Sequence, residues 1–180
     1  MKLPAEFIRA SKYNGILLSP LALAINVASQ KVWLFQKRAP GTTSGYALTK
    51  TFRCSTSRFG TGQLAGSNRT PLGLHRVAEK IGGGWPVGTV FKSRRPVGFT
   101  WQGLPEAMIT TRILWLDGLE PGFNRGGDVD SHSRHIYIHG TGDEPSLGRP
   151  ASCGCIHLAA DELIPLFDRL AAGSFVWIQQ

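Results

Sequence analysis

Cysteine and acidic residues are scarce in this sequence, and each shortage argues against a class of protein. There are three cysteines in 180 residues, and so small and odd a number argues against a disulfide framework. Twelve Asp and Glu stand against twenty Lys and Arg, which gives a formal net charge of +8. Such a charge attracts anionic partners, but the basic residues are scattered and do not interleave with aromatic ones. We therefore expect no nucleic-acid platform.

Long apolar runs are also lacking, and no segment has the length of a membrane span. The apolar segment 16–28 follows Arg9 and Lys12, and its Ala22-Leu23-Ala24 resembles a signal-peptide cleavage site. Ser19-Pro20 interrupts that segment, however, and residues 21–27 also fit a first strand. We favour an uncleaved chain in which 1–21 form an N-terminal leader and 22–179 form one domain.

What the sequence has in plenty is turn residues and aromatics, with 22 glycines, 11 prolines, nine Phe and five Trp. This composition is typical of a protein of strands and turns. Strands are predicted at 23–27, 32–36, 46–55, 74–78, 109–116, 135–140 and 175–178. Leu163, Ile164, Phe167 and Leu170 have helical spacing, which predicts a helix over 161–170 capped by Asp161. Segment 81–105, rich in Gly, Pro and aromatics, is interpreted as an ordered loop or a lid over a cleft. The predicted fold is therefore mainly β (α+β), a sandwich or open barrel with one clear helix near its end.

A histidine and a cysteine lie beside glycines in a pattern that suits catalysis. Residues 135–140 read His-Ile-Tyr-Ile-His-Gly, a strand in which His135, Tyr137 and His139 share one face. Cys155 follows sixteen positions after His139, directly after Gly154. A thiol attacks as thiolate, and a neighbouring imidazole can accept its proton. The pattern predicts a thiol nucleophile with an imidazole base, whereas Cys54 is expected to be buried and inert.

Gly154 also indicates where a reacting carbonyl would lie. Without a side chain, it lets the backbone approach a substrate closely. The backbone amides of Cys153, Gly154 and Cys155 are predicted to form an oxyanion hole.

These motifs resemble the L,D-transpeptidase family, with its YkuD-type catalytic domain. The family signature is His-Gly, a variable loop and then Ser-His-Gly-Cys-Ile-Arg; here it reads His139-Gly140 and later Ser-Cys-Gly-Cys-Ile-His over 152–157. The first hairpin and the turn Thr70-Pro71-Leu72-Gly73 are similar to the family as well. The resemblance covers roughly 22–179.

The resemblance implies a catalytic domain that transfers acyl groups on peptidoglycan stem peptides. Cys155 would be the nucleophile that forms a thioester, His139 the proton donor and acceptor, and the Gly140 carbonyl the group that orients the imidazole. No metal or organic cofactor is implied, and the cell envelope is the expected location, although the lack of a clear signal peptide leaves the cytoplasm open. The expected substrate-binding and oxyanion residues are Ser152, Cys153, Gly154 and His157.

Two residues depart from the family signature. Cys153 replaces a histidine, so only its backbone amide and a weak thiol donor remain at that position. His157 replaces an arginine, and because imidazole is shorter and only partly charged at neutral pH, we expect weaker binding of a donor carboxylate. A disulfide between Cys153 and Cys155 is not favoured, because so small a ring is strained.

Three alternatives stay open at this stage. Water as the acceptor would make the protein an L,D-carboxypeptidase, and a scaffold without catalysis would be a binding module. Zinc binding is the third: six potential ligands lie within 26 residues. On one strand His135 and His139 would lie ~13 Å apart, too far to share an ion, but a partial site using His132 with the cysteines stays open. The oligomeric state is not predicted. The six ligands are His132, His135, His139, Cys153, Cys155 and His157.

Overall fold

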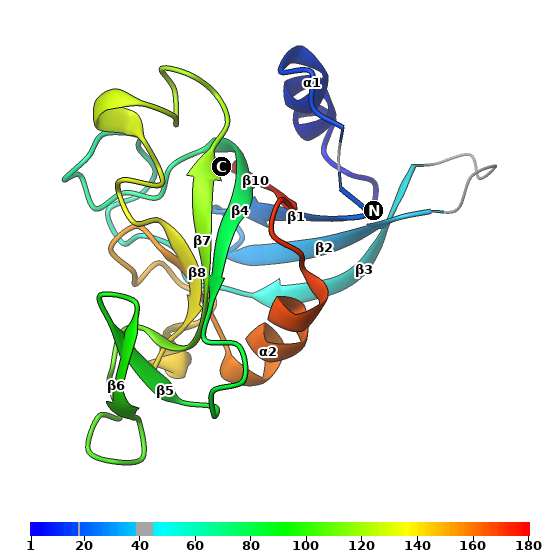
Figure 1. Cartoon of the computed structure of the whole chain (residues 1–180). Coiled ribbons are helices and arrows are strands. Elements are labelled where there is room, and N and C mark those ends of the chain that lie inside the picture. Colours follow the sequence, from blue (N-terminus) through cyan, green and yellow to red (C-terminus); the bar gives the residue numbers. More distant parts are fainter. Residues whose placement is uncertain (18, 39–44) are drawn as a thin grey trace.

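The computed structural model describes residues 1–17, 19–38 and 45–180, so Leu18 of the apolar segment 16–28 lies outside the described residues. The described chain forms one open ten-stranded sheet and two α-helices (Figure 1). The mainly β prediction is confirmed. The strands are β1 Leu21–Asn26, β2 Lys31–Lys37, β3 Tyr46–Arg53, β4 Gly73–Ile81, β5 Thr89–Lys92, β6 Arg95–Phe99, β7 Thr110–Gly118, β8 Tyr137–Gly140, β9 Ile156–Leu158 and β10 Phe175–Gln179. The helices are α1 Ala5–Tyr13 and α2 Ala160–Arg169, with short 3-10 turns at Gly127–Val129 and Glu144–Ser146.

The strand order runs β3-β2-β1-β10-β4-β7-β5-β6, and β8 pairs with both β7 and β9. The predicted hairpin is present as β1 and β2, which pair antiparallel. The last strand, β10, lies parallel to β1 and antiparallel to β4, so the end of the chain joins its two halves. The sheet curls around a core that contains the inward residues of β1, β2, β7, β8 and β9.

Alternation along β1 gives the sheet two buried faces. Leu23 and Ile25 point into the main core, while Ala22 and Ala24 point to a second cluster on the opposite side. Helix α1 covers that second cluster with Phe7, which is fully buried. The predicted leader is therefore packed against the sheet through this helix (Figure 1). Neither helix of the described residues has the length and apolarity that crossing a membrane requires.

Helix α2 packs against the sheet, where it contacts β7 and β8 (Figure 1), and Leu163 and Phe167 bury its inner face as the spacing predicts. The predicted cap is wrong, because Asp161 lies inside the first turn and makes no capping hydrogen bond. Instead Glu144 Oε1 accepts the Ala160 amide at 2.8 Å. The orphan amide at the helix start is thus satisfied by a residue sixteen positions away.

The segment predicted as a loop over 81–105 contains the hairpin of β5 and β6. Its turn residues Ser93 and Arg94 both have positive φ, 49° and 66°. Two such residues form the turn type that matches the twist of a tight hairpin. The hairpin joins the sheet where Val90 of β5 pairs with Thr110 of β7, so it projects beside the strand that neighbours β8.

Candidate active site

Strands β8 and β9 set the geometry of the site. They pair in parallel, with Ile138 opposite Ile156 and His139 opposite His157. Both isoleucines are fully buried in the core. Because side chains alternate along a strand, the two histidines lie on the other face of the sheet, where their ring centroids are 4.6 Å apart.

His139 is held as a neutral imidazole. Its Nδ1 lies 2.8 Å from the Gly140 carbonyl oxygen, and because a carbonyl only accepts, Nδ1 carries the proton and Nε2 is left as the acceptor. Burial, and after it the charge of nearby His157, lowers the pKa of His139 to about 3, against the opposing effect of the Gly140 carbonyl. A Cβ at Gly140 would lie 2.8 Å from the Thr110 carbonyl oxygen, so this position has room only for glycine.

The Cys155 thiol lies directly before β9, beside Tyr137. Its Sγ donates to the His135 carbonyl oxygen at 3.4 Å, and the side chain packs against the cluster that contains Trp115 and Tyr137. Burial raises the pKa of Cys155 to about 11, although a hydrogen bond from the Tyr137 amide and the charge of Arg134 act in the opposite direction. The resting thiol is therefore protonated at neutral pH.

The structure corrects the predicted position of His135. It precedes β8 rather than lying in it, and its φ of 56° turns the chain there. The prediction that His135, Tyr137 and His139 share one strand face therefore holds only for the last two. The turn points the His135 carbonyl at the thiol. Among the hydrogen bonds of the described residues, none joins Cys155 to His139. His139 lies in β8 opposite His157, whereas Cys155 directly precedes β9 and its thiol is reached by the Tyr137 amide.

The segment before Cys155 is held by its own hydrogen bonds. Ser152 is buried; its Oγ donates to the Cys155 carbonyl at 2.6 Å and accepts the Gly154 amide at 3.2 Å. Thr70 Oγ1 donates to the Gly154 carbonyl at 3.0 Å, and Gly154 has a φ of 122°, a conformation open to glycine. Ser152 thus acts as a local tether, and one of the three amides considered for the oxyanion hole is already engaged.

Two cavities adjoin this segment, and exposed Cys153 lines both. The larger, of about 670 Å³, also contains His157, Arg58 and Asp143 on its walls. The other, of about 390 Å³, is also lined by Arg134. Burial lowers the pKa of His157 to about 4, against the opposing charge of Asp143. Its Nδ1 is buried without a hydrogen-bond partner.

Arg134, which holds the loop beside the thiol, was not predicted as a site residue from the sequence. Its guanidinium donates to the carbonyl oxygens of Gly62, Gln63 and Arg69 at 2.6–3.2 Å. No local pattern marks this arginine, because its partners lie about 65–72 positions earlier in the chain.

The structure also describes the state of the three cysteines and bears on the zinc alternative. Cys54 is fully buried, as predicted, and burial raises its pKa to about 12. Cys153 and Cys155 are free thiols. Within the described part of the chain, no three His, Cys, Asp or Glu side chains are grouped so that they could hold one metal ion.

Solved structures support the fold. The Bd1075 protein of Bdellovibrio bacteriovorus aligns with a TM-score of 0.56 and 13% identity, over 90% of this chain and 48% of that one. L,D-transpeptidase 3 of Mycobacterium tuberculosis, solved with a faropenem-derived adduct, aligns with a TM-score of 0.53 and 13% identity, over 89% of this chain and 60% of that one. An L,D-transpeptidase of Xylanimonas cellulosilytica aligns with a TM-score of 0.52 and 18% identity, over 95% of this chain and 68% of that one. The chain thus spans about half to two thirds of the length of these proteins.

Sequence comparison with curated proteins found no match. The family described as "YkuD: L,D-transpeptidase catalytic domain", by contrast, matches residues 20–178, nearly the whole chain. With the fold and the His139-Gly140 and Cys155 motifs in agreement, this chain belongs to the L,D-transpeptidase catalytic domain family.

Proposed function

We propose that this protein is a cysteine-dependent L,D-transpeptidase that acts on peptidoglycan stem peptides through a thioester at Cys155. The observation that carries the proposal is the parallel pairing of β8 with β9: His139, a neutral and singly oriented imidazole, lies in β8, and Cys155 directly precedes β9. The family acts on peptidoglycan. A substrate in the cell envelope is part of the proposal.

The resting site, with a protonated thiol and a neutral imidazole, fits proton transfer during attack. Cys155 Sγ gives its proton to His139 Nε2 while the sulfur bonds to the donor carbonyl carbon, at an L-centre of the stem peptide. The carbonyl oxygen becomes an oxyanion, for which the Cys153 and Cys155 amides are the candidate donors. His139 then returns the proton to the leaving nitrogen of the terminal D-residue as the C–N bond breaks, leaving a thioester.

The second half-reaction regenerates the thiol. The amine of a second stem peptide attacks the thioester, and sulfur leaves as its proton is restored through His139. The product is an amide cross-link. With water in place of the amine the product is a shortened peptide, and the same residues would act as a carboxypeptidase.

Product analysis tests the proposal. Purified protein is incubated with a tetrapeptide muropeptide, and the products are identified by mass spectrometry. We expect a cross-linked dimer with loss of one D-residue per link; a shortened monomer alone would assign the carboxypeptidase activity. If neither product forms while the protein is folded, the proposed function is wrong.

A further inference from the structure

The tip of the β5–β6 hairpin places an arginine over the site. From the turn at Ser93 and Arg94, the Arg94 side chain reaches Trp115 of β7 and Tyr137 of β8. Its guanidinium carbon lies 4.5 Å from the Trp115 ring centroid, and its Nη1 is 3.3 Å from Tyr137 Oη. Arg94 is half-buried, whereas its neighbour Arg95 is exposed.

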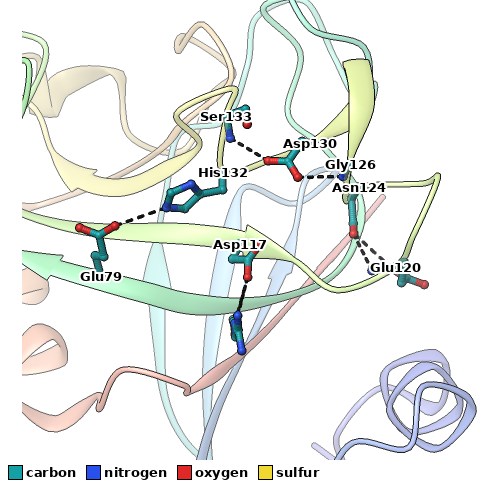
Figure 2. A network of polar contacts seen from close by, with 9 residues as sticks. Glu79, Asp117, Glu120, Asn124, Gly126, Asp130, His132 and Ser133 are labelled. Carbon is teal, nitrogen blue, oxygen red and sulfur yellow. Dashed lines mark hydrogen bonds and ion pairs between the residues drawn. The ribbon is translucent and has the colours of Figure 1, made fainter.

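The rings beneath Arg94 are held rigidly. Trp115 Nε1 donates to the His132 carbonyl at 3.0 Å, and the His132 imidazole stacks on Trp115 at 4.0 Å and 4° between planes. Figure 2 shows the Glu79 carboxylate directed at the His132 ring; its Oε1 lies 3.4 Å from Nε2. The carboxylate on this face is therefore paired with His132. Ion pairs among the described residues do not include Arg94.

Arg94 faces the surroundings of the thiol. Cys155 packs against the cluster of Trp115 and Tyr137, the two residues that Arg94 contacts. Burial, and after it the charge of Arg94, lowers the pKa of His135 there. The site beside the thiol is thus positive, with a guanidinium that has five N–H donors and one hydroxyl partner.

We propose that Arg94 binds a carboxylate of the donor peptide and orients that peptide for attack by Cys155. The inference rests on the proposed function and names a part of its substrate. The planar guanidinium fork matches a carboxylate with two parallel hydrogen bonds. Stacking on Trp115 and the contact with Tyr137 fix the fork in advance, which lowers the entropy lost on binding. Two carboxylates of a stem peptide share this chemistry: that of the terminal D-residue and that of a side chain.

Donor peptides in which one carboxylate at a time is replaced by an amide test the inference. Binding is measured by calorimetry in the Cys155→Ala background, so that it does not depend on turnover. Arg94→Gln is compared with Arg94→Lys and with Arg95→Gln, the matched control on the same hairpin. We expect Arg94→Gln to weaken binding of the carboxylate donor roughly 10- to 100-fold, the range of a charge-assisted pair.

The pattern across peptides decides the role of Arg94. Amidation of one carboxylate should weaken binding to the Arg94 protein by a similar factor and have no further effect on Arg94→Gln, which also identifies the carboxylate. Arg95→Gln should behave as the parent. If Arg94→Gln weakened binding of the carboxylate and amide donors equally, or of neither, the inference would be overturned. Arg94 would then only hold the hairpin against Trp115 and Tyr137. Muropeptide turnover by the unmodified protein is recorded separately, so a failure of the proposed function is distinguishable.

Discussion

His139 and Cys155 are both uncharged at rest because burial disfavours the charged form of each. A thiolate and imidazolium pair formed in advance would need the opposite shifts, a raised pKa for the histidine and a lowered one for the cysteine. The structure instead favours transfer of the proton as the substrate arrives. A bound peptide displaces water from the site, and the thiol then faces the carbonyl carbon that it attacks.

Alkylation of Cys155 therefore has a predictable pH dependence. With a thiol pKa of about 11, the thiolate fraction increases with pH throughout the neutral range. We expect the rate of reaction with iodoacetamide, a neutral reagent, to rise about tenfold per pH unit from pH 7 to 9. Modification is followed by mass spectrometry in a Cys153→Ala variant, which removes the exposed thiol. A rate that levels off by pH 7 would indicate a preformed thiolate.

The motif predicted Cys155 and His139 because their chemistry depends on residue type and on glycine neighbours, whereas the role of the Gly140 carbonyl came from the family resemblance. Sequence could not place His135, whose left-handed φ breaks the alternation that 135–140 suggests. It also could not find Arg94 or Arg134, since each acts on partners far away in the chain.

Among the elements, α2 depends on a contact made from outside the helix. Replacing Glu144 with Ala removes the acceptor of the Ala160 amide, and the loss of a helix cap costs about 1 kcal/mol. We expect Glu144→Ala to lower the free energy of unfolding by this amount in urea titrations. Asp161→Ala is the matched control and should have a smaller effect, because Asp161 makes no capping hydrogen bond. A larger loss of stability for Asp161→Ala than for Glu144→Ala would show that Asp161 caps the helix, as the sequence predicted.

The elements differ in how well they could be predicted. The β1–β2 hairpin and α2 have regular apolar spacing, and both are where the sequence places them. The β5–β6 hairpin has strands of only four and five residues, and Pro96 and Gly98 disrupt the alternation in the second. The local pattern predicts a loop there, but pairing between the two segments makes them strands.

At the scale of the whole molecule, buried histidines couple stability to pH. Burial lowers the pKa of His75 from 6.5 to about 4, where its ring is held by the Gly73 carbonyl and Ser131. Between these values the unfolded chain binds a proton that the folded protein does not, so the stability present above pH 6.5 is lost as pH falls toward 4. His139 acts in the same direction down to about pH 3.

Urea unfolding at pH 7 and pH 4.5, followed by tryptophan fluorescence, measures this coupling. We expect His75 alone to contribute about 2–3 kcal/mol to the loss of stability. A His75→Gln variant should be less sensitive to pH between these points, whatever its stability at pH 7. An unchanged difference in that variant would place the proton uptake elsewhere.

The molecular topology was the least predictable part. Strand β10 lies between β1 and β4, pairing Val176 with residues about 100 and 150 positions away. Composition predicts many strands, and alternation predicts which face is buried, but neither specifies partners at such separations. The strand order is therefore a finding of the structure, and solved structures such as Bd1075 share the fold.

The covalent intermediate offers the most direct test of the central claim that Cys155 is the acylated nucleophile. The protein is incubated with the tetrapeptide donor without an acceptor amine, the reaction is stopped with acid, and intact mass and peptide mapping locate any acyl group. We expect one acyl group per chain on Cys155, retained in Cys153→Ala, absent in Cys155→Ala and formed far more slowly in His139→Gln. An acyl group on Cys153 that persists in Cys155→Ala would contradict the assignment of Cys155 as the nucleophile.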